Sequence, residues 1–312
     1  MKCLVTGGAG FIGSHLCEGL LREGHNVISV DNYIAGKSAN LERIKYHPQF
    51  TEVFADINDT GKMNLLLKGV DVVFHQAASK KNVCERSPVM DLEVNARGTL
   101  HLLELCLNHG VKKFVHASTG SVYGEAVGVQ DENHPLNPAS YYGVSKLAGE
   151  KYVQLFHKLH GMNTTIFRYF HVYGSRQDDS TYGGVVSIFD KNLREGLPLL
   201  VYGDGTQQRS FTHVDDVVRA NLLSIYDKPG QIYNCASAIK VTINELVDIM
   251  KGFHGKPEHE VIYKDWLNGD IKCFNIDNSK IRRELGINFT TDIYEGLEKT
   301  IKDITTYYTN RA

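Results

Sequence analysis

The sequence predicts an α/β fold with a doubly wound parallel sheet of the Rossmann type and a smaller lobe contributed mainly by the C-terminal part. Short apolar runs rich in Val, Ile and Phe alternate with longer amphipathic runs, which is typical of strand–helix–strand units. Three glycines follow the first apolar run, and Asp31 ends the second. Together these features predict a sheet with a ligand site at the carboxyl ends of its strands.

The apolar runs are interpreted as strands and the amphipathic runs as helices. Glycines stand where left-handed caps would end the expected helices, at Gly24, Gly69, Gly110 and Gly161. The predicted strands are 2–6, 26–31, 51–55, 72–75, 113–118, 164–168 and 231–235. The predicted helices between them are 13–23, 59–68, 90–108 and 140–160.

The alternation stops after about Arg168. Segment 201–216 predicts a loop and a hairpin, whereas 242–250 and 279–286 predict amphipathic helices. We expect two interleaved domains. The predicted division is a cofactor-binding domain of residues 1–168 and 212–238, and a substrate-binding lobe of residues 169–211 and 239–312.

Composition and charge restrict the class of protein. The 312 residues are 42% hydrophobic and 22% charged, with a formal net charge of −2, which argues against nucleic acid or an anionic membrane as partner. No apolar stretch approaches a membrane span and no signal peptide is evident. The six cysteines and fourteen histidines show no metal-ligand spacing. We therefore expect a cytoplasmic protein without a metal site.

The stretch "TGGAGFIG" predicts a dinucleotide site. Gly7, Gly10 and Gly13 are spaced for a tight turn that lets the backbone approach a pyrophosphate at a helix N-terminus. Asp31, at the end of the next predicted strand, would accept hydrogen bonds from a ribose diol and repel a 2′-phosphate. The predicted cofactor is therefore NAD rather than NADP.

The segment "YYGVSK" places Tyr142 and Lys146 four residues apart on one helix face. A lysine ammonium and a positive nicotinamide ring would lower the pKa of the phenol, so that Tyr142 could take a proton from a sugar hydroxyl. Ser118 ends the predicted strand 113–118, and Thr119 and Ser121 follow it. A hydroxyl at this strand end could bridge substrate and Tyr142. Strand-end capping is the alternative role for these hydroxyls.

These segments resemble the extended short-chain dehydrogenase/reductase family, in its nucleotide-sugar epimerase/dehydratase branch, and are most similar to the 4-epimerases. The resemblance runs along almost the whole chain through "TGGAGFIGSHL", "HQAAS", "VNARGT", "STGSVYG", "YYGVSK", "FRYFHVYGSRQ" and "YGDGTQQRSFTHVDDV".

The resemblance implies a role for each matching residue. Tyr142 would be the base, Lys146 the cofactor anchor and Thr119 the helper hydroxyl, and Arg209 would meet the substrate diphosphate. The remaining expected NAD contacts are Gly7, Gly10, Phe11, Ile12, Gly13, Asp31, Asn32, Asp56, Ile57, Ala77, Ala78, Lys80 and Asn95. The remaining expected substrate contacts are Ser121, His171, Asp270 and Phe274.

The residues after Thr119 bear on the reaction. Related dehydratases carry Asp-Glu there and decarboxylases a glutamate one place later, whereas this chain has Gly120 and Ser121. The expected activity is therefore a UDP-hexose 4-epimerase that passes through a 4-keto sugar. A UDP-uronic acid 4-epimerase, a dehydratase, a decarboxylase and a non-catalytic NAD-binding regulator are the alternatives.

Several positions leave the substrate open. His171 stands where the family usually has asparagine, and Leu267 where it has an arginine that meets phosphate. Phe274 would crowd an N-acetyl group if it lines the sugar pocket, and is otherwise a core aromatic. The cations of "SKKNVCERSP", namely Lys80, Lys81 and Arg86, would suit an anionic sugar or belong to a solvated loop. Family likeness also implies a homodimer through the helices 90–108 and 140–160.

Overall fold

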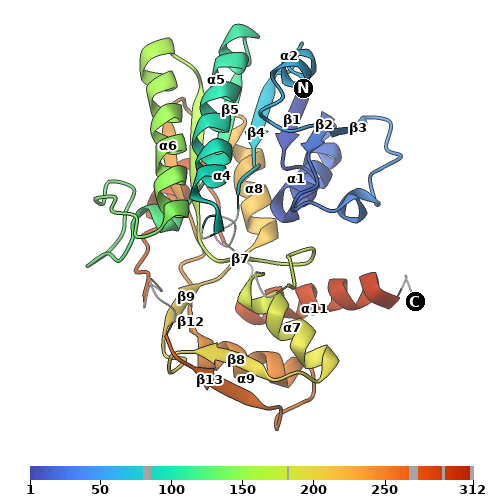
Figure 1. Cartoon of the computed structure of the whole chain (residues 1–312), viewed down its shortest axis with the longest axis vertical. Helices are drawn as coiled ribbons and strands as arrows, with labels where there is room; N and C mark the ends of the chain where they lie inside the picture. The colour runs from blue at the N-terminus through green and yellow to red at the C-terminus, as the bar shows by residue number, and fades with distance from the viewer. Residues whose placement is uncertain (80–83, 85, 181–182, 267–272, 290–291, 310–312) are drawn as a thin grey trace.

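The computed structural model has two parts, a large sheet covered by helices and a smaller lobe that holds the C-terminal helix (Figure 1). It describes residues 1–79, 84, 86–180, 183–266, 273–289 and 292–309. Of the predicted site residues, Lys80 and Asp270 lie outside this part of the chain, as do Lys81 and Leu267.

The large sheet is parallel and has the strand order β11-β6-β5-β4-β1-β2-β3. Its chain order reverses at the β1–β4 boundary, and such a reversal opens a crevice at the carboxyl ends of the strands. All seven predicted strands are confirmed. Their bounds are β1 (Lys2–Thr6), β2 (Asn26–Asp31), β3 (Phe50–Phe54), β4 (Val72–His75), β5 (Lys113–Thr119), β6 (Thr164–Tyr169) and β11 (Gln231–Cys235).

Helices cover both faces of the sheet because successive strand residues point to opposite sides. Cys3 and Val5 of β1 pack with the face that carries α1, α8 and α10, while Leu4 packs with the face that carries α2, α5 and α6. The doubly wound fold class is therefore confirmed. The helix bounds are α1 (Phe11–Arg22), α2 (Thr60–Leu66), α5 (Gly98–Asn108), α6 (Tyr141–His160), α8 (Val214–Ser224) and α10 (Ser279–Leu285).

The helix predicted over 90–108 is interrupted. It begins as α4 (Pro88–Leu92), passes through the π-helical turn η2 (Glu93–Arg97) and continues as α5. Short 3₁₀ segments occur at η1 (Ser38–Leu41) and η3 (Gly120–Val122). π-turns are rare and often mark functional sites, and this one holds Asn95. The four glycines predicted as caps all have positive φ, between 64° and 77°.

The smaller lobe is held by its own apolar core, which includes Phe189, Leu199, Leu246 and Leu297. Its strands pair with distant partners: β8 runs parallel to β13, and β9 runs antiparallel to β12. The hairpin predicted in 201–216 is therefore wrong, since β8 and β9 do not pair with each other. The bounds are β7 (Val172–Tyr173), α7 (Val185–Glu195), β8 (Leu199–Tyr202), β9 (Gln208–Ser210), β10 (Thr212–His213), β12 (Lys240–Thr242), α9 (Ile243–Phe253), β13 (Val261–Lys264) and α11 (Ile293–Thr309).

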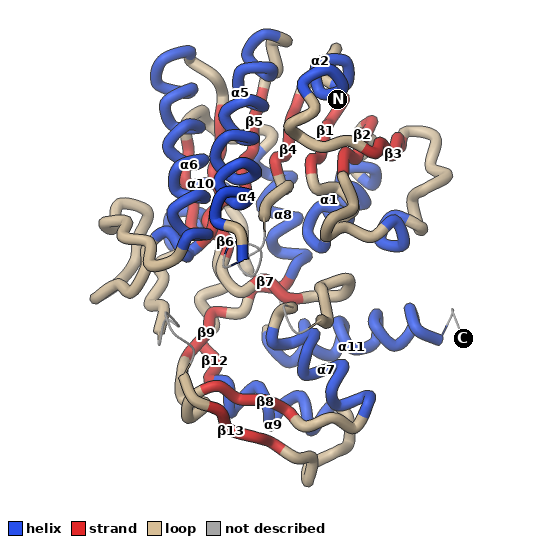
Figure 2. The backbone as a smooth tube through the Cα atoms, in the orientation of Figure 1, coloured by secondary structure: helices blue, strands red, loops and turns tan. Residues whose placement is uncertain are grey.

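The chain crosses between the two parts more than once (Figure 2). It leaves the sheet after β6, returns with β10 and α8, and leaves again after β11. We keep the interleaved division into 1–168 with 212–238 and 169–211 with 239–312 as a proposal, with one exception. Helix α10 is best assigned to the sheet, because Ile281 packs in the core beside α8 and β11.

Candidate active site

The turn between β1 and α1 needs glycine for two different reasons. Gly7 has φ +66°, and a Cβ added there would lie 2.8 Å from the backbone of Ala77. A Cβ on Gly13 would lie 2.1 Å from the Gly7 carbonyl oxygen. Helix α1 begins after Gly10 without a side-chain cap, so its first N–H groups are available to an anion, as a pyrophosphate requires.

Replacing Gly7 by alanine is expected to weaken NAD binding at least tenfold and to destabilise the fold. The left-handed conformation alone costs an L-residue roughly 1–2 kcal/mol, and the contact with Ala77 would displace the turn. Gly24→Ala is the matched control, because Gly24 also has positive φ but no atom lies within 4 Å of an added Cβ. Calorimetric NAD titration of both variants tests this. Equal affinities would contradict it.

Asp31 is held beside the glycine turn. The Ala9 N–H donates to Asp31 Oδ2 at 3.0 Å, and the Tyr33 N–H donates to Oδ1 at 2.8 Å. Burial raises the pKa of the carboxyl, and the backbone N–H groups oppose this rise. The fixed carboxylate therefore stands at the carboxyl end of β2, where the sequence predicted a partner for the adenosine ribose.

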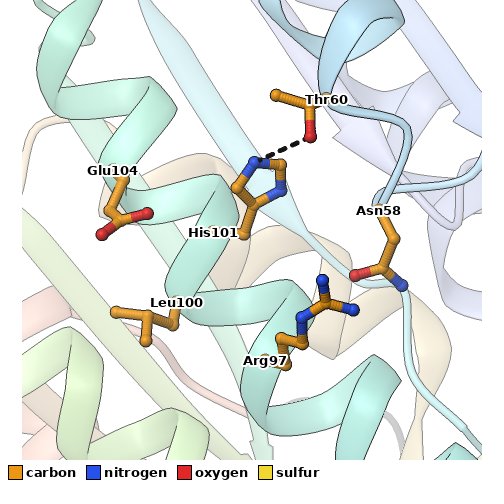
Figure 3. Close-up of a pocket in the computed structure, with 6 residues that line it drawn as sticks. All are labelled: Asn58, Thr60, Arg97, Leu100, His101 and Glu104. Atoms are coloured by element: carbon orange, nitrogen blue, oxygen red, sulfur yellow. Dashed lines mark hydrogen bonds between the residues drawn. The ribbon is translucent and has the colours of Figure 1, made fainter.

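The predicted adenine border lies at the next strand end. Asn32 Nδ2 donates to Asp56 Oδ2 at 2.7 Å. Ile57 packs closely on Gly98, because a Cβ added to Gly98 would lie 2.7 Å from Ile57 Cδ1. Beyond them a cavity of about 220 Å³ opens between the start of α2 and α5 (Figure 3). Its lining is Asn58, Thr60, Arg97, Leu100, His101 and Glu104, so it contains no predicted site residue.

Asn95 joins the loop after β4 to two helices. Its Oδ1 accepts from the Ser79 N–H at 2.9 Å, and its Nδ2 donates to Asp91 Oδ1 at 2.7 Å and Ser145 Oγ at 3.1 Å. The residue is fully buried. Ala77 lies on the same loop, and its N–H donates to Thr6 Oγ1 at 3.2 Å. We propose that Asn95 shapes the cofactor site rather than contacting NAD directly, because protein groups use both ends of its amide.

Tyr142 and Lys146 lie on the first two turns of α6, which Ser140 caps through a bond from the Gly143 N–H. Thr119, the last residue of β5, hydrogen-bonds to the Tyr142 side chain, and its Oγ1 also contacts Ser121 Oγ at 3.2 Å. Lys146 is 2% exposed, and burial lowers its pKa to about 8. The three predicted catalytic residues therefore meet where β5 and α6 adjoin.

The protein groups alone do not lower the pKa of Tyr142. Burial raises it to about 12, the Thr119 bond opposes that rise, and Cys84 and Asp91 add to it. The expectation that the lysine would make the phenol more acidic is thus not met by the chain by itself. The reason is that removal from water disfavours the phenolate. A bound nicotinamide ring would supply an opposing positive charge.

The predicted substrate residues His171, Arg209 and Phe274 form a second cluster. The His171 ring lies 5.4 Å from that of Phe274 and 6.1 Å from that of Phe211. Burial, with the nearby Arg209 charge, lowers the pKa of His171 to about 3, so the imidazole is neutral. Phe274 is 7% exposed and packs on Phe170, as a core aromatic would.

Comparison with known proteins decides the family. The model of the NAD dependent epimerase/dehydratase family matches residues 3–236. The chain belongs to this family. A putative UDP-glucose 4-epimerase of Methanocaldococcus jannaschii is 40% identical over 309 residues, which is 96% of each chain.

Solved structures of family members agree with the fold. A UDP-glucose 4-epimerase from Thermotoga maritima, solved with UDP-glucose, is 36% identical with a TM-score of 0.93, covering 100% of this chain and 99% of the other. A dTDP-glucose 4,6-dehydratase from Streptomyces venezuelae, solved with NAD, is 32% identical with a TM-score of 0.92, covering 99% and 97%. The cofactor of this family member is therefore NAD, and both reaction types occur among its relatives.

One feature of this epimerase/dehydratase site was missed from the sequence. Arg168 and Glu150 form a fully buried ion pair, with Arg168 Nη2 2.6 Å from Glu150 Oε1. Ser118 Oγ donates to Glu150 Oε2 at 2.9 Å, so the pair joins β5, β6 and α6 next to the catalytic residues. Its only signal in the sequence is that Glu150 follows Lys146 by four residues on the same helix face.

Neither a metal-binding cluster nor a membrane-spanning helix occurs in the described part of the chain. No group of three or more His, Cys, Asp or Glu side chains there could hold a metal ion. None of the helices there is long and apolar enough to cross a membrane.

Proposed function

We propose that the protein is an NAD-dependent UDP-hexose 4-epimerase. The observation that carries the reaction type is at Gly120, the position after Thr119. A Cβ there would lie 2.3 Å from Phe170 Cε1, so this backbone leaves no room for an acidic side chain. Neither Gly120 nor Ser121 can protonate or deprotonate a sugar carbon, which dehydration and decarboxylation in this family require.

The residues on hand suit oxidation and reduction at a single carbon. When bound, NAD supplies the reversible hydride acceptor for C4 of the sugar. Tyr142 Oη takes the proton of the 4-hydroxyl as that carbon becomes a ketone, and gives it back when the carbon is reduced on its other face. Lys146, which follows Tyr142 by one helical turn, carries a positive charge below its pKa of about 8 and would anchor the cofactor. Thr119 holds the phenol through its hydroxyl.

The substrate end of the proposal rests on the second cluster. A guanidinium at Arg209 suits a diphosphate, and the neutral His171 offers a hydrogen-bonding ring nitrogen without adding charge. If Phe274 borders the sugar, its bulk would favour glucose and galactose over N-acetylhexosamines. The second candidate is a UDP-uronic acid 4-epimerase, favoured by the exposed cation Arg86 in the segment before α4.

The proposal includes a cytoplasmic homodimer. The six cysteines are all free, which suits a reducing compartment. Helix α6 presents large apolar side chains to solvent, with Val144 54% and Leu155 45% exposed. Pairing of α5 and α6 with those of a second copy would cover them.

Proton NMR of the purified protein with UDP-glucose, UDP-N-acetylglucosamine and UDP-glucuronic acid, each in a separate sample, tests the substrate. The expected result is conversion of UDP-glucose to its 4-epimer and slower or no conversion of the other two. Conversion of UDP-glucuronic acid alone would establish the second candidate. If all three remain unchanged while NAD is bound, the proposed substrate is wrong.

A further inference from the structure

Asp91 is a buried carboxylate that the proposed chemistry does not use. It lies on α4 and is 1% exposed. Cys84 Sγ and Asn95 Nδ2 both donate to its Oδ1, each at 2.7 Å. An ionised carboxylate is an acceptor only, and both of these partners are donors. Because burying a charge is costly without compensation, the position of Asp91 calls for a reason.

Asp91 is connected to the catalytic helix through Asn95. The same Nδ2 that binds Asp91 also donates to Ser145 Oγ at 3.1 Å, and Ser145 directly precedes Lys146. The other end of the Asn95 amide accepts from the Ser79 N–H. Helix α4 also packs directly against α6. Asp91 therefore fixes the helix that carries Tyr142 and Lys146 relative to the loop after β4.

The charges around Lys146 show what this carboxylate does electrostatically. Asp91 and Glu150 are the anions that oppose the lowering of the Lys146 pKa by burial, and Asp91 has the larger effect. The facing strands contribute His75 and His116, whose pKa values burial keeps far below neutrality, so neither adds charge.

The same carboxylate acts on Tyr142, the remaining titratable group on this face of α6. Asp91 and Cys84 both raise the pKa of its phenol. Asp91 is thus the anion that acts on both members of the predicted catalytic pair.

We propose that Asp91 is a positioning residue: through Asn95 and Ser145 it fixes the start of α6 against the loop after β4, and its buried carboxylate supplies a negative charge that favours the Lys146 ammonium. It touches neither substrate nor cofactor in this role and acts through Asn95 and through its charge. The role rests on the proposed function only in that Tyr142 and Lys146 are taken as catalytic.

The test is an NMR titration of Lys146 in protein labelled with [ε-¹³C]lysine, the signal being assigned by its loss in Lys146→Met. Removing a nearby anion disfavours the ammonium, so Asp91→Asn is expected to lower the Lys146 pKa by about 1 unit. Asp91→Glu keeps the negative charge, so the Lys146 pKa in this variant should equal that of the unsubstituted protein. Glu93→Gln is the matched control, since Glu93 is the next acidic residue and pairs with Arg97 on the surface. Asp91→Ser serves if Asp91→Asn does not fold.

The activity profile gives a second readout. Loss of the anion lowers the pKa of both Lys146 and Tyr142, so the whole pH profile of kcat/KM should move to lower pH in Asp91→Asn. A purely structural role would lower the profile without moving it. If Asp91→Asn or Asp91→Ser folds and the Lys146 pKa does not change, the proposal is wrong. Because the NMR titration needs no substrate, it stays informative if UDP-hexose turnover is not found.

Discussion

Tyr142→Phe is expected to lower kcat by roughly 10²–10⁴-fold, the usual contribution of a positioned acid–base group. Phenylalanine keeps the ring that α6 buries but has no oxygen to accept the proton of the 4-hydroxyl. The Thr119 bond to the side chain is lost with it. The variant should fold and bind NAD with little change, because the glycine turn and Asp31 are unaffected. Turnover of UDP-glucose and NAD titration measure the two effects.

Tyr141→Phe is the matched control for that experiment. Tyr141 is the adjacent residue and 61% exposed, so removing its hydroxyl should leave the rate unchanged. Retention of more than about a tenth of the activity in Tyr142→Phe would show that another group takes the proton. The pKa of Tyr142 adds a second check: it should fall from about 12 on addition of NAD, followed by phenolate absorbance.

Arg168→Met is expected to lower the free energy of unfolding by about 3–5 kcal/mol, the usual cost of leaving a buried charge without its partner. Glu150 would lose two bonds, from Arg168 Nη2 at 2.6 Å and from Nε at 3.1 Å. Tyr123 OH would also lose its bond from Arg168 Nη1 at 2.7 Å. Urea denaturation of the two proteins gives the difference directly.

The surface pair of Arg97 and Glu93 provides the comparison. Arg97 Nη1 lies 2.5 Å from Glu93 Oε2, which is as close as the buried pair, but both side chains are largely exposed. Arg97→Met should therefore change stability by only about 0–1 kcal/mol. If Arg168→Met costs no more than Arg97→Met, the buried pair does not contribute as described. Loss of activity in Arg168→Met beyond its loss of folded protein would show that the pair also positions Ser118 and α6.

The sheet could be predicted from the sequence because its signals are local. Each strand is a short apolar run, most connections contain a helix with its own amphipathic pattern, and glycines such as Gly69 and Gly161 mark helix ends. The smaller lobe could not be predicted in this way. Its strands are only two to four residues long, and β8 pairs with β13 about sixty residues away. Such pairing depends on the assembled fold and leaves no local pattern.

The same distinction between local and non-local signals applies to the residues of the site. Tyr142, Lys146, Thr119 and Asp31 were predicted because their spacing on one element, or their place at a strand end, is visible in the sequence. Arg168 and Asp91 were missed because their roles come from burial and from partners on other elements. The pKa of Tyr142 was predicted to fall under the combined charge of Lys146 and a bound nicotinamide ring. The rise that burial causes in the chain alone could not be predicted, since desolvation is a property of the folded site.

The most direct measurement follows deuterium at C4. UDP-[4-²H]glucose is incubated with the NAD-loaded protein in ordinary water, and the product is examined by NMR and mass spectrometry. A 4-epimerase of the proposed kind gives UDP-galactose that keeps its deuterium at C4, because the same hydride leaves and returns. A 4-keto-6-deoxy product, or a 4-epimer in which solvent hydrogen has replaced the deuterium, would contradict the proposed reaction.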